Sequence, residues 1–318
     1  MGPAGPSIAL LAEYDALPEV GHGCGHNLIA ISNVGAFLAA AADAQRLEIG
    51  VELIGTPAEE KGGGKIDLLA AGVFDRTIAA LSSHPAGQAA WVVSGTGLGV
   101  VGKRVTYHGV AAHAGSSPER GRNALNAVIR LFTGVDGWRQ HLDADSRVHG
   151  IISDGGAAMN VVPARAEAVF GLRAKDRPTL DAMVDRFTAI ANGAAQLTGT
   201  TVEIAEALRY YAPVSAHAGL GDVIAEELGR QGIIPERGTL VTASTDLGNV
   251  SQKVPTDWIR FPVTASPIAG HSDAMREACV SDLAHRNALV TAEALGATAA
   301  RVATDVALRE SLREGAER

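Results

Sequence analysis

The sequence has few cysteines and few aromatic residues. Only two cysteines, Cys24 and Cys279, occur in 318 residues, so the chain is not a small secreted domain held by disulfides, and we expect a reducing, cytoplasmic compartment. Phe, Trp and Tyr together make up 4% of the residues. This leaves few side chains on which nucleobases could stack.

Long basic runs and long apolar runs are also missing. Lys and Arg number 27 against 35 Asp and Glu, a net charge of −8, so neither nucleic acid nor a membrane surface is an expected partner. The apolar run that starts at Ile8 ends at Glu13, and we expect neither a signal peptide nor a transmembrane segment. What the chain does have is 47% hydrophobic residues, enough for a sizeable core in one or two domains.

Strand and helix patterns alternate near the N-terminus. Buried strands are predicted at 7–11, 48–56 and 77–81, with helical segments at 28–44 and 66–73. This alternation is typical of a mostly parallel α/β sheet, in which functional groups collect in loops beyond the carboxyl ends of the strands. The last helical run is expected to extend from Asp273 to about Leu312.

The pattern changes near Gly95. Extended segments and one-sided helices then follow in the order strand, helix, strand, strand, helix, strand, which is typical of a ferredoxin-like α+β domain. We therefore predict a discontinuous catalytic domain of residues 1–94 and 211–318, with residues 95–210 inserted into it.

The loop before the first helix holds the densest group of possible metal ligands. His22, Cys24 and His26 alternate with glycines, which let the backbone bring alternate side chains to one point. Cys24 and His26 form the stronger pair, and His22 is treated as a bystander. The alternative is a polar loop with an incidental free thiol.

Two adjacent carboxylates follow the second strand. Glu59 and Glu60 come after Thr56-Pro57-Ala58, and neighbouring residues of an extended chain point in opposite directions. This geometry suits a division in which one carboxylate binds a metal and the other acts as general base. A solvated acidic loop is the alternative.

Two further histidines occupy comparable positions. His84 follows the third predicted strand, and His271 precedes the last helical run. A single histidine is more often structural than a ligand. Here three strand ends and one helix start each carry Cys, His or Glu, so these side chains could converge on one point.

Three motifs in order carry a family resemblance. The run 11–18 (LAEYDALP), the run 23–27 (GCGHN) and the run 57–60 (PAEE) resemble the dimetal aminoacylase and carboxypeptidase family of metallopeptidases and amidohydrolases. The Cys-Gly-His loop is similar to the branch with a cysteine ligand. Asn27 and the run 244–251 (STDLGNVS) resemble aminobenzoyl-glutamate hydrolase B-type subunits and related dipeptidases.

The resemblance implies roles for matching residues. It implies that the site binds two divalent metal ions, zinc or manganese, and that Glu59 is the general acid/base. It also implies that Asp15 orients a metal ligand without binding the metal itself. The mixed thiolate, imidazole and carboxylate donors do not select one metal. The implied metal ligands are Cys24, His26, Glu60, His84 and His271.

The inserted domain resembles the lid and dimerisation domain of the same family. On this resemblance His113 stabilises the oxyanion in a neighbouring subunit, while Asn160 and Arg173 hold the substrate's carboxylate. A homodimer formed through the lid is implied. Without the resemblance, His113 would be an edge-strand residue, Asn160 a turn former and Arg173 the partner of a surface ion pair.

The resemblance thus implies a metallohydrolase domain with an inserted lid, and an enzyme that cleaves the amide bond of a small N-acyl amino acid, dipeptide or aminobenzoyl-glutamate-type substrate bearing a free carboxylate. The alternative is a non-catalytic or partner-dependent subunit that binds such amides. Members of the family usually have several tens of residues before the strand that begins here at Ser7. We expect the sheet to lack the elements that this segment supplies.

Overall fold

The computed structural model describes residues 1–238 and 240–316. Contacts along the chain divide it into two units. The first combines Met1–Gly97 with Val214–Arg318, and the second is Leu98–Pro213. Each unit has a hydrophobic core of its own.

A mostly parallel sheet forms the centre of the first unit. Its strand order is β10-β4-β12-β3-β1-β2, and all neighbours pair in parallel except β12 and β4. The strands are β1 (Ser7–Glu13), β2 (Gly50–Thr56), β3 (Thr77–Ala86), β4 (Val92–Val93), β10 (Glu236–Arg237) and β12 (Thr256–Pro262). A separate two-stranded sheet pairs β5 (Thr96–Gly97) with β11 (Leu240–Val241).

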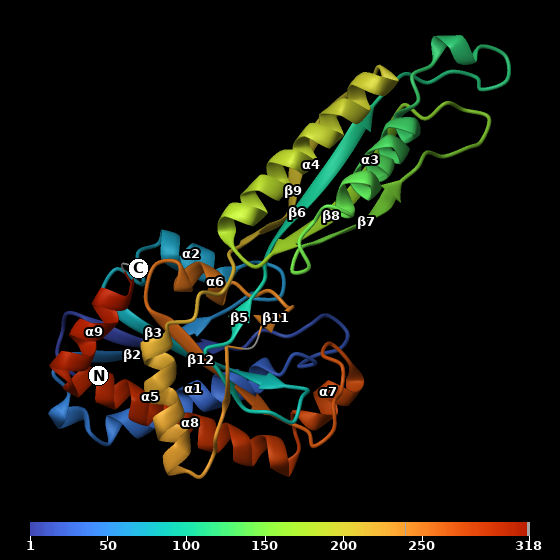
Figure 1. The fold of residues 1–318 in the computed structure, drawn as a ribbon. Coiled ribbons are helices and arrows are strands. Elements are labelled where there is room, and N and C mark those ends of the chain that lie inside the picture. The colour runs from blue at the N-terminus through green and yellow to red at the C-terminus, as the bar shows by residue number, and fades with distance from the viewer. Residues whose placement is uncertain (239, 317–318) are drawn as a thin grey trace. The chain divides into compact units, whose positions relative to one another are not determined.

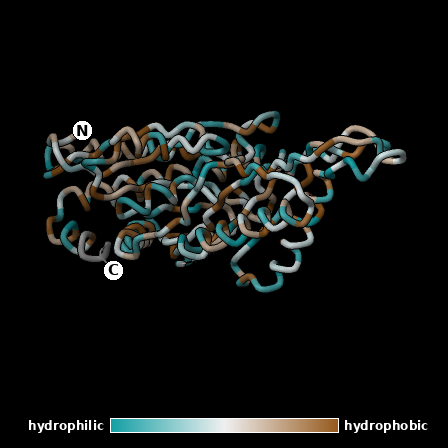
Figure 2. Tube along the Cα trace, turned by 90° about the horizontal axis from the view of Figure 1, so that it is seen from above, coloured by the Kyte–Doolittle hydropathy of each residue, from teal (hydrophilic) through white to brown (hydrophobic). Residues whose placement is uncertain are grey.

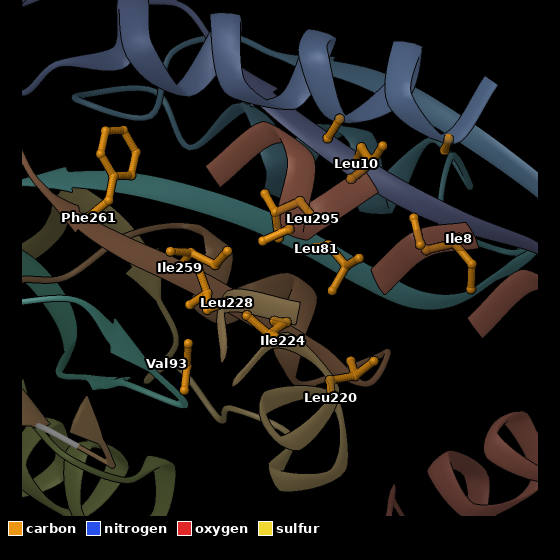
Figure 3. Close-up of a cluster of buried hydrophobic side chains, with 14 of the residues drawn as sticks. Ile8, Leu10, Leu81, Val93, Leu220, Ile224, Leu228, Ile259, Phe261 and Leu295 are labelled. Atoms are coloured by element: carbon orange, nitrogen blue, oxygen red, sulfur yellow. The ribbon is translucent and has the colours of Figure 1, made fainter. Parts of the chain in front are cut away.

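Both faces of this sheet are covered, because successive strand residues point to opposite sides. Ile8, Leu10 and Ile259 belong to the core shared with α1 (His26–Ala41), α5 (Ala218–Arg230) and α8 (Asp282–Thr304) (Figure 3). Their neighbours Leu11 and Trp258 belong to a second core. This second core includes residues of α6 (Leu247–Ser251), which contacts α2 (Gly64–Ala70).

Two element predictions for this unit were wrong. The third strand does not end at Leu81, because β12 pairs with it as far as Ala86, so His84 lies inside the strand. The final helical run is three helices, α7 (Asp273–Ala278), α8 and α9 (Val306–Ala316). The hydroxyl of Ser281 caps α8 by accepting a hydrogen bond from Ala284, and Asp305 is extended, which separates α8 from α9.

The second unit has the predicted ferredoxin-like order. Its antiparallel sheet runs β7-β8-β6-β9, and α3 and α4 lie side by side on one face of it (Figure 1). The elements are β6 (Gly99–His108), α3 (Ala124–Arg139), β7 (Arg147–Asp154), β8 (Arg165–Ala174), α4 (Arg177–Thr198) and β9 (Thr201–Tyr211). Short 3₁₀ helices are η1 (Ala44–Arg46) in the first unit and η2 (Pro118–Arg120) in the second.

Hydrophobic and hydrophilic residues are interleaved along the coloured part of the trace (Figure 2). Within the described part of the chain, no helix combines the length and the apolar character needed to cross a membrane.

Candidate metal centre

The loop between β1 and α1 brings Cys24 and His26 to the end of β3. Gly25 makes this approach possible, since it has a φ of +80° and a Cβ there would lie 2.4 Å from Cγ of Pro85. Any other residue would push the loop away from the strand. The Cys24 Sγ atom consequently lies 3.6 Å from Nε2 of His84.

His26 is the first residue of α1 and is fully buried. Its Nδ1 atom lies 3.3 Å from Oδ1 of Asp15, whose Oδ2 atom accepts a hydrogen bond of 3.1 Å from the backbone N–H of Glu60. The opposite ring atom, Nε2, lies 3.6 Å from Glu13, 3.8 Å from Glu60 and 3.9 Å from Glu59, measured to carboxylate oxygens. Asp15 therefore orients the His26 ring toward a group of carboxylates.

The charges around His26 shift the pKa of both partners. Burial alone would raise the pKa of Asp15, but the hydrogen bonds from His26 and from the Glu60 backbone lower it to about 2. Burial would lower the pKa of His26, but Asp15 and the charges of Glu13 and Glu59 raise it to about 9. Without a metal, the site therefore holds a proton on His26 that a metal ion would displace.

Glu59 and Glu60 lie in a turn after β2 rather than in extended chain. Ala58, just before them, has a φ of +60°, and the turn brings both carboxylates to the same His26 atom. The expectation that they point in opposite directions was therefore wrong. Burial and the charge of Glu13 raise the pKa of Glu59 to about 8, although the charge of Lys65 opposes this. A carboxyl group of this kind can take up and give back a proton near neutral pH.

His84 and His271 complete the cluster from two other elements. The Nδ1 atom of His84 donates a 2.7 Å hydrogen bond to the carbonyl of Pro85, which leaves the Nε2 lone pair facing Cys24. Burial lowers the pKa of His84 to about 3, so this ring is neutral. The exposed His271 has a φ of +57° and places Nε2 3.8 Å from Oε2 of Glu60.

These residues fit a metal ion. Their ligand atoms fall into three overlapping groups, within each of which all atoms lie no more than 4.8 Å apart. The groups are Cys24, His26 and His84; Cys24, Glu60 and His271; and His26, Glu59 and Glu60. His22 belongs to none of the three.

The hydrogen bonding of the cluster also indicates a metal site. Nε2 of His26, Oε1 of Glu60 and Oε2 of Glu13 are buried and form no hydrogen bond among the described residues. Buried polar atoms are normally paired, and separations of 3.6–3.8 Å are too long for a hydrogen bond but leave space for a shared cation. Burial and the surrounding glutamates also raise the pKa of the Cys24 thiol, a cost that a bound cation would offset.

A buried ion cluster below these ligands was missed from the sequence. Lys65 is fully buried, and its ammonium group contacts Oε1 of Glu13 at 2.8 Å and Oδ1 of Asp246 at 2.5 Å. The backbone N–H of Lys65 also donates to Asp246. Local spacing carries no signal for this cluster, because 181 positions separate Lys65 from Asp246.

In the second unit, His113 and Asn160 lie close together. The carbonyl of Asn160 accepts a hydrogen bond from Ala114, and Nδ1 of His113 accepts hydrogen bonds of 3.1 Å from the backbones of Gly115 and Ser116. This pattern puts the ring proton of neutral His113 on Nε2.

Arg173 lies at the other end of β8. The start of β8, Arg165, pairs with His108, and Arg173 pairs with Val100. Eight residues of strand at about 3.3 Å each separate the two ends by roughly 26 Å. Asn160 precedes β8, so the structure does not bring Asn160 and Arg173 of one chain together.

Comparison with known proteins agrees with this architecture. Residues 98–197 match the model of a peptidase dimerisation domain. The chain is 36% identical to the Xaa-Arg dipeptidase of Mus musculus, covering 98% of this chain and 74% of that protein. It is 31% identical to one of the subunits of the p-aminobenzoyl-glutamate hydrolase of Escherichia coli, covering 98% and 80%.

Solved structures confirm the predicted fold class. An aminobenzoyl-glutamate utilization protein from Klebsiella pneumoniae matches with a TM-score of 0.70 at 24% identity, covering 94% of this chain and 72% of that one. A dinuclear metal-binding peptidase of the M20 family from Bacillus subtilis matches with a TM-score of 0.67 at 21% identity, covering 92% and 81%. Both likenesses are of fold.

Proposed function

Since the chain belongs to the M20 family of peptidases and amidohydrolases, an enzyme family that hydrolyses amide bonds, we propose that it is a metal-dependent hydrolase of small amides with a free carboxylate. The substrate classes are N-acyl amino acids, dipeptides and aminobenzoyl-glutamate-type amides. The observation that carries the proposal is the convergence of Cys, His and Glu side chains from the loop and helix start after β1, the turn after β2, strand β3 and the loop before α7. They surround buried polar atoms that form no hydrogen bond among the described residues.

In this proposal Cys24, His26, Glu60, His84 and His271 hold two divalent metal ions, zinc or manganese. Such ions, when bound, acidify a water molecule and polarise the amide carbonyl. The protein contributes the orientation of the ligands. Asp15 fixes the His26 ring, and the carbonyl of Pro85 fixes the tautomer of His84.

Glu59 is the proposed general acid/base. Its carboxylate lies beside the cluster, 3.9 Å from Nε2 of His26, and its surroundings raise its pKa. It takes the proton from the attacking water and then delivers it to the nitrogen of the leaving amine. Bond cleavage releases a carboxylic acid and an amine.

The second unit, predicted from the sequence as residues 95–210, is proposed as the lid and dimerisation domain, and residues 1–94 and 211–318 as the catalytic domain. His113 presents Nε2–H as a donor for the oxyanion, supported by the two backbone donors on Nδ1. Asn160 and Arg173 bind the substrate's carboxylate. Because Asn160 precedes β8 and Arg173 lies near the far end of that strand in one chain, we propose that a homodimer combines one residue from each subunit.

A cytoplasmic location completes the proposal. Cys24 and Cys279 are both free thiols. A site that depends on a reduced cysteine ligand suits a compartment that keeps thiols reduced.

Hydrolysis by metal-stripped protein with zinc or manganese restored tests the proposal. The panel comprises aminobenzoyl-glutamate, β-alanyl-lysine and several N-acetyl amino acids, each beside its carboxamide, and bound metal per chain is measured in parallel. Metal-dependent cleavage of any member supports the hydrolase. Stoichiometric metal binding with no cleavage across the panel, in the dimeric protein, would contradict it.

Arg173→Ala tests the carboxylate clamp within the same experiment. It should raise KM for the substrates with a free carboxylate and spare their carboxamides. An equal rise in KM for the free carboxylates and for their carboxamides would show that Arg173 does not bind the substrate's carboxylate.

A further inference from the structure

Arg260 lies next to the metal-ligand cluster, on a strand that contributes no ligand. Strand β12 runs parallel to β3, and Arg260 is in register with His84. Side chains in register on adjacent strands project from the same face of a sheet. The Arg260 side chain therefore leaves the sheet on the same side as the His84 ring.

An aromatic residue holds Arg260 in this place. The guanidinium carbon lies 6.0 Å from the ring centroid of Trp258, and the Trp258 ring meets the His84 ring edge-on with centroids 6.0 Å apart. Trp258 is itself buried and donates from Nε1 to the carbonyl of Gly95 at 2.8 Å. The fixed indole ring of Trp258 therefore both attracts the guanidinium group of Arg260 and holds it in position.

Arg260 also acts electrostatically on the cluster. Burial is the main cause of the lowered pKa of His84, and the charges of His26 and Arg260 add to it. Burial lowers the pKa of Arg260, and the charge of a thiolate at Cys24 opposes this. These effects decay with distance, so they agree with the strand register in placing the guanidinium beside the ligands.

Arg260 forms no ion pair or hydrogen bond with any side chain that the structure describes. Other arginines of the first unit do, since Arg301 contacts Glu226 and Arg309 contacts Glu48. The Arg260 side chain is only partly exposed, and burial lowers its pKa. A partly desolvated guanidinium offers five N–H donors in a fork that matches a carboxylate.

We propose that Arg260 binds a carboxylate on the acyl part of the substrate, so that the enzyme prefers dicarboxylic acyl groups such as N-succinyl. The inference rests on the proposed function, which already assigns the carboxylate of the amine part to Asn160 and Arg173 of the second unit. Because that carboxylate already has its binding residues, we expect Arg260, beside the metal ligands, to bind a second anionic group on the acyl part of the substrate.

Kinetics on a matched pair of substrates tests this. N-succinyl-alanine and N-succinamoyl-alanine differ only in the charge at the end of the acyl chain. The wild-type enzyme should favour the succinyl compound in kcat/KM by roughly 10- to 100-fold, the range expected for a charge-assisted hydrogen-bonded pair. Arg260→Met should remove this preference, Arg260→Lys should retain part of it, and Arg46→Met, at an exposed surface arginine, should leave it intact.

Calorimetric binding of succinate and of succinamate to the metal-loaded protein provides a readout independent of turnover. The wild type should bind succinate more tightly, and Arg260→Met should bind both alike. If neither acyl-alanine nor any other amide is cleaved but this binding pattern holds, the proposed function fails and the carboxylate site stands. If amides are cleaved without a succinyl preference, or if Arg260→Met folds normally and keeps the preference, the carboxylate site is overturned and the hydrolase stands.

Discussion

One carboxylate, Asp15, contacts two separate parts of the candidate metal centre. Its Oδ1 atom lies 3.3 Å from Nδ1 of His26, while its Oδ2 atom accepts the backbone N–H of Glu60. Two proposed ligands, one at the start of α1 and one in the turn after β2, are thus oriented by a single side chain. These hydrogen bonds lower the pKa of Asp15 to about 2, so its carboxyl group is ionised in the folded protein at neutral pH.

Asp15→Asn should weaken metal binding by about 10- to 100-fold, the usual effect of removing a group that orients a ligand. An amide cannot supply the negative charge that supports His26. Equilibrium dialysis against zinc or manganese measures the change. Asp43→Asn, at an exposed position, is the matched control, and equal affinities in all three proteins would rule out the orienting role.

Glu59→Gln should leave metal content unchanged and lower kcat by about 100-fold or more. Glutamine keeps the shape of the side chain but cannot carry the proton between water and amine. Metal analysis and steady-state kinetics on the same preparation separate the two effects. An unchanged kcat would show that Glu59 is not the general acid/base. A loss of bound metal would show that it is a metal ligand instead.

Lys65→Met should lower the free energy of unfolding by about 3–5 kcal/mol, because it leaves the buried carboxylates of Glu13 and Asp246 without their cation. Urea denaturation of the metal-free protein measures the loss. Lys253→Met, at an exposed lysine, should change stability by less than about 0.5 kcal/mol. Similar small losses in both variants would contradict a stabilising role for the ion cluster.

Asp257 should make stability depend on pH. Burial raises its pKa from 3.8 to about 7, although hydrogen bonds from Trp258 and Ser94 oppose this. Between these values the folded protein binds a proton that the unfolded chain has released. The stabilising contribution is therefore complete below pH 4 and is lost as the pH rises through about 7.

Asp257→Asn does not titrate, so the difference in unfolding free energy, wild type minus variant, should fall by a few kcal/mol between pH 4 and pH 8. Urea denaturation across this range measures it. A difference that stays constant with pH would show that Asp257 has an ordinary pKa.

The sequence was sufficient for the fold class because the signals were local. Strand and helix periodicity predicted both the parallel sheet and the order of elements between Gly95 and Arg209, and the comparisons confirm the fold class. The extent of β3 was not local, since its last residues are strand only because β12 pairs with them. The final helices were merged because alanine-rich sequence continues helical periodicity across Ser281, and the capping there became clear only from the structure.

The candidate site also has one part that the sequence predicts and another part that it does not. Cys24, His26 and Glu60 lie in short motifs at strand ends, where the parallel sheet brings them together. Lys65 and Asp246 pair across 181 positions, and no spacing in the sequence indicates that contact. Arg260 is hidden for the same reason, because its relation to His84 depends on strand register.

The central claim is that five side chains hold two metal ions. Anomalous diffraction at the zinc edge, on crystals grown with zinc after chelator treatment, tests it most directly. We predict two peaks per chain at coordinating distance from Cys24, His26, Glu60, His84 and His271. No peak there, or zinc bound only by other residues, would contradict the account.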